Sequence, residues 1–155
     1  MSVRYARGDI FLTRAHALAV GINATGRLGV APETTALQDR YPVFVSDCHK
    51  RGRAGTLAPG TAWVWQEGQP WVVGLVVRET PPGATRLRYV ETAILNLCRD
   101  WEREGLRSLA LLRLGEDTEW SEAREIAIRY LDPLVWPVII YEEYLPGVVA
   151  EPTAE

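Results

Sequence analysis

Residues 83–112 read GATRLRYVETAILNLCRDWEREGLRSLALL, and this stretch decides the class of the fold. From residue 86 to 104 its apolar side chains recur every three or four positions, which is the spacing of one face of an α-helix. Gly105 follows as a residue that can end the helix in a left-handed conformation. The apolar run at 108–112 then predicts a buried strand. A long helix followed directly by a buried strand indicates an α/β protein.

The sequence before this stretch has the same alternation of strands and helices. Residues 3–7 alternate apolar and polar side chains, which predicts a half-buried edge strand. Residues 17–22 are almost wholly apolar and predict a central strand that is covered on both faces. Two helical segments follow at 34–40 and 43–50. They are separated at Pro42 because proline cannot continue the hydrogen bonds of a helix.

The remaining segments complete the set of elements. Residues 61–66 and 70–77 are rich in Trp and Val and predict a β-hairpin. Residues 114–120 read as a loop, and residues 121–131 as a helix with Ser121 as its N-cap. A last strand is expected at 137–141. The order of these elements predicts a three-layer α/β/α sandwich with a mixed central sheet.

We expect a single domain over residues 1–145 and a flexible tail at 146–155, where Pro, Gly and Glu are frequent. Ligands of such sheets bind at the carboxyl ends of the strands. Four predicted loops lie at those ends, and we expect the functional residues in them. They are residues 8–11, 23–29, 78–83 and 114–120.

The composition is that of an ordinary globular protein, with 47% apolar residues and a formal charge of −3 over 155 residues. Apolar runs reach only about eight residues, whereas a membrane helix needs about twenty, so we expect no contact with a membrane. The charged N-terminus does not resemble a signal peptide, which favours a cytoplasmic protein. Cys48 and Cys98 form no CxxC pair and only two histidines are present, so we expect neither a metal nor a cofactor.

In their order along the chain, the motifs in these loops resemble those of the macro domain. They most resemble the DarG type, which removes ADP-ribose from DNA bases. The matching pieces are Gly8-Asp9-Ile10, residues 17–29, Arg40-Tyr41-Pro42, residues 60–65, Thr85-Arg86-Leu87, and residues 109–115 with Trp120 after them. The resemblance covers nearly the whole chain. It implies the macro fold and, as ligand, ADP-ribose or a related adenine nucleotide.

The first motif implies a contact with adenine. In the family its acidic residue accepts a hydrogen bond from the adenine amino group, which assigns Asp9 to that role, with Ile10 beside it in the ligand site. The same carboxylate is equally suited to capping the short turn that starts at Ile10. Both interpretations remain open on the sequence.

The second motif implies contacts with the distal ribose. The resemblance places Asn23 there, next to the bond that is cleaved, and Val20 stands where the family has another Asn. Gly26 and Gly29 would let backbone N–H groups approach a sugar or a phosphate closely. The alternative for both glycines is a tight turn with a positive φ.

Arg78 stands where the DarG type has its catalytic lysine. Arginine can hold an anion or stabilise developing charge, but it does not act as a base because it stays protonated. The resemblance therefore makes Arg78, with Asn23, the candidate catalytic residues. A solvent-exposed ion pair with Glu79 or Glu116 is the alternative role for this arginine.

The expected phosphate loop departs furthest from the family. Its run of glycines is shortened here to Gly115, which is followed by Glu116-Asp117-Thr118-Glu119. By resemblance Gly115, Glu116 and Trp120 belong to the ligand site. Three carboxylates would repel a diphosphate unless a metal ion or nearby arginines compensate for their charge. A solvated turn is the alternative for this segment.

Three functions fit these observations. The first is an enzyme that hydrolyses ADP-ribosyl links on DNA or protein. The second is a binding module that keeps the pocket without turnover, because Arg78 transfers no proton. In the third, the fold serves protein interaction, and Trp63, Trp65 and Trp71 belong to the core or to a dimer contact. We expect a monomer or a weak homodimer.

Overall fold

The computed structural model describes residues 2–154, apart from the side chain of Asp117. Within this range six strands form one sheet in the order β1-β6-β5-β2-β4-β3. They are β1 (Val3–Gly8), β2 (Ala17–Asn23), β3 (Ala62–Trp65), β4 (Trp71–Arg78), β5 (Leu109–Leu112) and β6 (Val138–Tyr144). The hairpin strands β3 and β4 are antiparallel, and the other described pairs are parallel. The expected mixed sheet is therefore confirmed.

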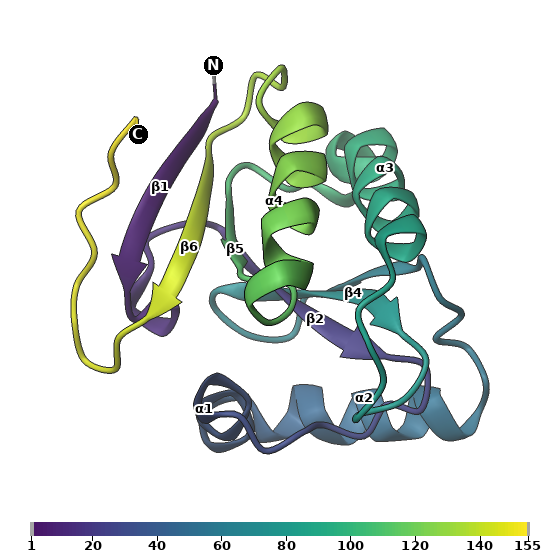
Figure 1. The fold of residues 1–155 in the computed structure, drawn as a ribbon. Coiled ribbons are helices and arrows are strands. Elements are labelled where there is room, and N and C mark those ends of the chain that lie inside the picture. Colours follow the sequence, from purple (N-terminus) through teal and green to yellow (C-terminus); the bar gives the residue numbers. More distant parts are fainter. Residues whose placement is uncertain (1, 155) are drawn as a thin grey trace.

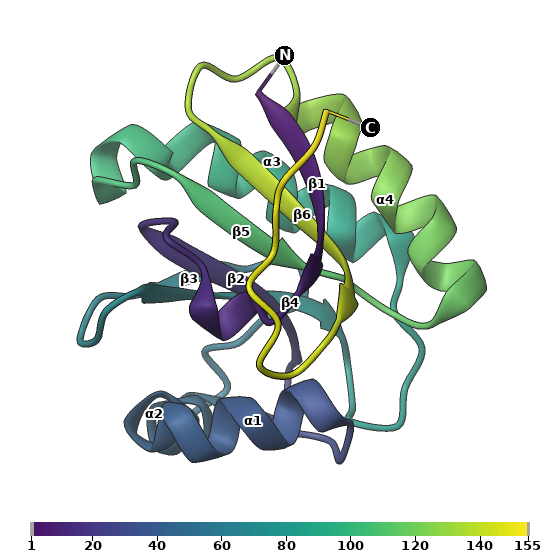
Figure 2. The same cartoon turned by 90° about the vertical axis from the view of Figure 1, so that its left-hand side faces the viewer.

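Helices cover both faces of the sheet. The helices α3 (Leu87–Glu104) and α4 (Asp117–Leu131) pack on one face, and α1 (Pro32–Arg40) and α2 (Pro42–Arg53) lie on the other (Figures 1 and 2). A short 3-10 helix, η1 (Ile10–Leu12), also contributes to the second face. The three-layer sandwich predicted from the sequence is confirmed.

The central strand β2 shows why its sequence is apolar without interruption. Ala17 and Ala19 face the core beneath α3 and α4. Leu18, Val20 and Ile22 face the second core, beneath α1 and α2. A strand that is covered on both faces needs apolar side chains at every position, which explains the run.

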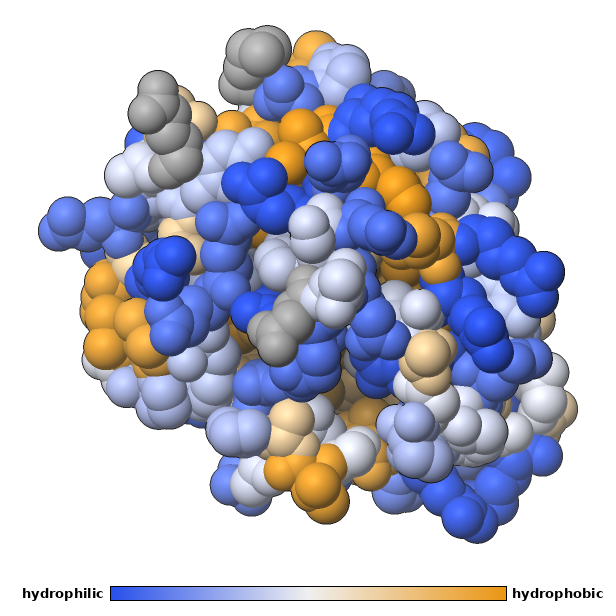
Figure 3. Space-filling model, viewed as in Figure 1, coloured by the Kyte–Doolittle hydropathy of each residue, from blue (hydrophilic) through white to orange (hydrophobic). Residues whose placement is uncertain are grey.

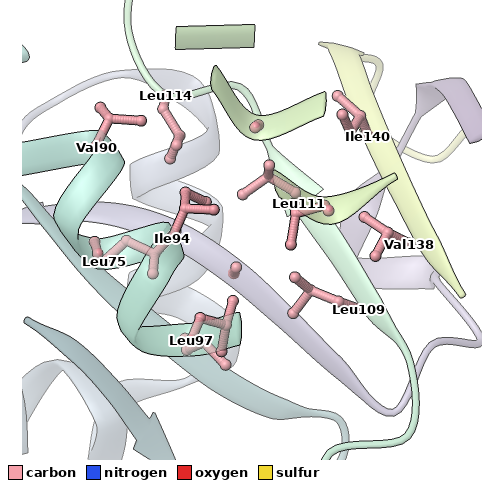
Figure 4. Packing of buried hydrophobic residues seen from close by; sticks show 14 of the residues in the cluster. Leu75, Val90, Ile94, Leu97, Leu109, Leu111, Leu114, Val138 and Ile140 are labelled. Carbon is pink, nitrogen blue, oxygen red and sulfur yellow. The ribbon is translucent and has the colours of Figure 1, made fainter. Parts of the chain in front are cut away.

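The core on the α3 side brings together side chains from α3, α4 and the strands of the sheet. In Figure 4, Ile94 and Leu97 of α3 point toward Leu75 of β4 and toward Leu109 and Leu111 of β5. The helix ends at Gly105, whose φ of 84° is in the left-handed region, as the sequence predicts. No described helix is both long and apolar enough to cross a membrane.

The segment 114–120 differs from the expected loop, because α4 already begins at Asp117. Its N-cap is Glu116 and not Ser121. The Glu116 side chain accepts a hydrogen bond from the Glu119 N–H, and the Glu119 side chain accepts one from the Glu116 N–H. This reciprocal pair is a capping box, and it starts the helix one turn earlier than a serine cap would.

The tail also differs from the expectation of a flexible segment. The chain after β6 turns back and runs beside β1 (Figure 2). The Tyr5 N–H donates to the Thr153 carbonyl at 2.7 Å, and the Thr153 N–H donates to the Tyr5 carbonyl at 2.8 Å. These bonds satisfy backbone groups that an edge strand would otherwise expose, which is why the tail is held there.

Candidate functional site

A cleft of about 840 Å³ opens at the carboxyl ends of β2, β4 and β5, where the topology of the sheet predicts a ligand site. The strand ends that form its floor are those at the arrowheads of β2 and β4 in Figure 1. One wall is formed by residues 28–34 at the start of α1, and another by residues 81–85 before α3. The start of α4 and the end of β6 also line it.

Asn23 and Arg78 lie side by side in this floor, because they are partners in the register of β2 and β4. The Asn23 side chain is only 2% exposed. Its Nδ2 donates to the Arg27 carbonyl at 2.6 Å, and its Oδ1 accepts from the Thr25 N–H at 3.0 Å. Asn23 therefore lines the cleft and also holds the loop that follows β2.

The two glycines of this loop have different surroundings. Gly26 has a φ of +73°, and a Cβ atom there would lie 2.1 Å from the Cys48 carbonyl oxygen. It is needed for the close approach of the loop to α2, which matches the tight-turn alternative. Gly29 lines the cleft, and a Cβ atom there would meet no atom within 4 Å.

Arg78 presents a half-buried guanidinium to the cleft. Its Nη2 donates to the Thr85 Oγ1 at 3.2 Å. Burial lowers the pKa of Arg78, and the charges of Glu119 and Glu116 act in the opposite direction. Because arginine titrates far above neutral pH, the group remains charged there. The ion pairs among the described residues include none between Arg78 and Glu79 or Glu116, which was the alternative role left open for this arginine.

The acidic segment is organised by backbone donors. Glu116 and Glu119 cap the start of α4, and the Glu119 Oε2 also accepts from the Thr85 N–H at 3.0 Å. Gly115, Glu116, Thr85 and Glu119 all line the cleft. Thr85 and Glu119 were not predicted from the sequence as site residues. An acidic residue three positions after another, just before an apolar helical pattern, is the signal that would have identified the capping box.

Gly26 does not line the cleft, and three further residues expected in the ligand site also lie elsewhere. Asp9 is 1% exposed, and its two oxygens accept from the Phe11 N–H and the Gly147 N–H, each at 2.9 Å. It caps η1, which is the alternative that the sequence left open. Ile10 is fully buried. Trp120 is 6% exposed and packs in the core beneath α3 and α4. None of these three described side chains lines the cleft.

Two of the tryptophans and both cysteines are packed against other side chains and do not form part of the cleft. Trp63 and Trp65 are buried against Phe44 on the α2 side. Burial raises the pKa of both Cys48 and Cys98 to about 11, so neither thiol is activated as a nucleophile. Within residues 2–154 no group of three or more His, Cys, Asp or Glu residues is placed to hold a metal ion.

Sequence comparison finds a relative among characterised proteins. The chain is 26% identical over 172 aligned positions to a DNA ADP-ribosyl transferase–DNA ADP-ribosyl glycohydrolase fusion protein of Thermosipho africanus. The alignment covers 94% of this chain and 44% of the relative, so the chain spans less than half of the relative's length. No protein-family model matches the chain.

Solved structures with the same fold include two from DarG proteins. The macrodomain of Thermus aquaticus DarG has a TM-score of 0.80 and 21% identity, covering 93% of this chain and 98% of that one. Thermosipho africanus DarTG in complex with ADP-ribose has a TM-score of 0.84 and 22% identity, covering 95% and 42%. This chain therefore has the macrodomain fold, and in sequence and structure it resembles the macro domain of the DarG type.

Proposed function

We propose that the cleft binds ADP-ribose or a related adenine nucleotide. The observation that carries this proposal is the half-buried guanidinium of Arg78 in a cleft of about 840 Å³ at the carboxyl edge of the sheet. A cleft of that volume is at the upper end of the range for small-molecule sites and has room for a nucleotide sugar. The DarTG structure with ADP-ribose supports the same class of ligand.

The lining of the cleft suits a ligand with one anionic and one flat apolar part. Arg78 offers a planar set of N–H donors, which matches the oxygens of a phosphate. Apolar surface comes from Leu37 and Leu112 and from the ring of Tyr144 at the end of β6. A nucleobase can pack on such surface while its phosphates reach the guanidinium.

Calorimetric titration with ADP-ribose tests the proposal. We expect saturable binding to the wild-type protein and at least about tenfold weaker binding to Arg78→Ala, because a charge-assisted phosphate contact is lost. Arg78→Lys keeps the charge and should retain part of the affinity.

The matched control is Arg103→Ala. Arg103 is exposed in the last turn of α3, at the end of the helix far from the cleft, so its loss should leave the affinity unchanged. Equal affinities for wild type, Arg78→Ala and Arg103→Ala would contradict the assignment of Arg78. The absence of any binding heat with millimolar ADP-ribose would contradict the proposal that the cleft binds this ligand.

Hydrolysis of an ADP-ribosyl link on DNA or protein is the activity that the fusion-protein relative suggests. Asn23 beside Arg78 is suited to orient a ribose and to stabilise charge. Binding without turnover is the second candidate. Two observations support it: Arg78 cannot accept a proton, and both Glu119 oxygens already accept backbone N–H groups.

Incubation with ADP-ribosylated DNA and with ADP-ribosylated protein separates the two candidates. Release of ADP-ribose by the wild type but not by Asn23→Ala would support the hydrolase, provided that the variant melts as a folded protein. Binding of ADP-ribose with no release from either substrate would support the binding module.

A further inference from the structure

The carboxylate of Glu119 joins two segments of the cleft lining that are far apart in the sequence, residues 81–85 and the start of α4. Its Oε2 accepts from the Thr85 N–H at 3.0 Å, and its Oε1 accepts from the Glu116 N–H at 3.3 Å. Thr85 belongs to the segment before α3, is 7% exposed and lies 34 positions from Glu119. One side chain on α4 therefore holds the backbone of both segments.

The same carboxylate is connected to Arg78 through Thr85. The Arg78 Nη2 donates to the Thr85 Oγ1 at 3.2 Å, so the threonine whose N–H binds Glu119 also positions the guanidinium. The negative charge of Glu119 opposes the effect of burial on the pKa of Arg78, which indicates that the two groups feel each other's charge. Part of the positive potential of Arg78 is thereby offset before any ligand arrives.

Gly115 allows Glu119 and Thr85 to approach each other closely, because it has no side chain. Its φ is +139°, and a Cβ atom there would lie 3.0 Å from the Glu119 Cβ and 3.3 Å from the Thr85 Oγ1. A larger residue would push the Glu119 carboxylate away from Thr85. The glycine between β5 and α4 and the glutamate on α4 therefore fit each other at the edge of the cleft.

We propose that Glu119 is a positioning and specificity residue of the cleft, which holds Arg78 through Thr85 and lowers the attraction of the cleft for highly charged phosphates. The proposal rests on the proposed function for the identity of its nucleotide ligand. The phosphates of ADP-ribose are both esterified and carry one charge each. A terminal phosphate ionises a second time near about pH 6 and carries close to two. A fixed carboxylate beside Arg78 penalises the terminal phosphate more than the esterified one.

The test compares wild type, Glu119→Gln and Glu122→Gln by titration with pyrophosphate, ADP-ribose and adenosine at pH 7.5. Glu122 is an exposed acid on the same helix and outside the cleft lining, so its variant removes the same charge without touching the site. We expect Glu119→Gln to bind pyrophosphate about tenfold more tightly at low salt and ADP-ribose about threefold more tightly, with adenosine unchanged. The gain should shrink at 0.5 M salt, because screening weakens the charge effect.

A purely structural role would not change the preference between pyrophosphate and ADP-ribose, nor its dependence on salt. Pyrophosphate affinities that are equal for the three proteins would overturn the inference, whatever happens with ADP-ribose. A gain with pyrophosphate in a protein that never binds ADP-ribose would instead support the inference and contradict the proposed function.

A second variant tests the positioning step if Glu119→Gln does not fold. Thr85→Val removes the Oγ1 acceptor of Arg78 and keeps the N–H that binds Glu119. Because the charge of Glu119 stays, we expect pyrophosphate and ADP-ribose to lose affinity by a similar factor, about threefold to tenfold. Unchanged affinity for both ligands in a folded Thr85→Val protein would overturn the inference.

Discussion

Two carboxylates in this molecule make the same kind of hydrogen bonds in different surroundings. Asp9 and Glu119 each accept two backbone N–H groups, one in the first turn of a helix and one from a distant segment. Asp9 is 1% exposed and binds the tail through Gly147, whereas Glu119 is partly exposed and lines the cleft. The hydrogen bonds alone therefore do not distinguish a structural acid from one that meets a ligand. The distinction lies in the backbone that each acid binds: Asp9 binds the C-terminal tail, and Glu119 binds a segment that lines the cleft.

The surroundings of Asp9 make it part of a closed structural unit. The Asp9 N–H donates to the Val148 carbonyl at 2.7 Å, so the residue binds the tail in both directions. The Arg40 guanidinium lies 3.9 Å from the carboxylate, and the Arg40 side chain is 48% exposed. The segments bonded to Glu119, in contrast, line the open cleft.

The largest effect that follows from this comparison is on stability at Asp9. Asp9→Ala removes the acceptor of the buried Phe11 N–H and of the partly buried Gly147 N–H, and with it the cap of η1. We expect the free energy of unfolding to fall by about 3 kcal/mol, measured by urea denaturation. Asp9→Asn, which keeps an acceptor oxygen, should lose about half as much.

Binding to the folded fraction should not change with either Asp9 variant, because Asp9 lies outside the cleft lining. An Asp9→Asn protein with wild-type stability that no longer binds ADP-ribose would break the comparison. In that case Asp9 would contact the ligand, as the resemblance to the family implies.

The two glycines of the loop after β2 extend the same comparison and predict a smaller effect. Gly26→Ala requires a left-handed alanine and a methyl group against the Cys48 carbonyl, so it should lower the free energy of unfolding by about 2 kcal/mol. Gly29→Ala meets no atom and should change it by less than about 0.5 kcal/mol. Similar melting temperatures for the two variants would show that the close approach at Gly26 does not determine the stability of the protein.

Most of the fold follows from local patterns in the sequence. The apolar spacing of α3 and the run of β2 depend only on neighbouring residues and on how many faces of the element are covered, so both were predicted correctly. The start of α4 was predicted wrongly because Ser121 was taken as the cap. Two glutamates three positions apart begin the helix at Asp117 instead.

The site was less predictable than the fold because its contacts are not local. Asn23 and Arg78 could be placed at strand ends, and the register of β2 and β4 brings them together in the structure. No sequence pattern links Glu119 to Thr85, since the bond exists only after α4 has packed beside α3. Trp120 has the spacing of the motif, but its ring packs in the core and does not line the cleft.

The smallest predicted effect concerns Cys48, which is buried in the core beneath α1 and α2 and whose carbonyl oxygen faces Gly26. Burial raises the pKa of this thiol from 9.0 to about 11, so between these values the folded protein keeps a proton that the unfolded chain releases. Its stabilising contribution is therefore complete below about pH 9 and is lost as the pH rises toward 11, with a fall of about 1 kcal/mol between pH 8 and pH 10. Urea denaturation of wild type and Cys48→Ala under reducing conditions measures this loss of stability. Cys98 is present in both proteins, so its own pH dependence cancels in the comparison. The wild type should lose stability more steeply over this range, and parallel pH dependences would mean that the thiol is not shielded beneath the loop.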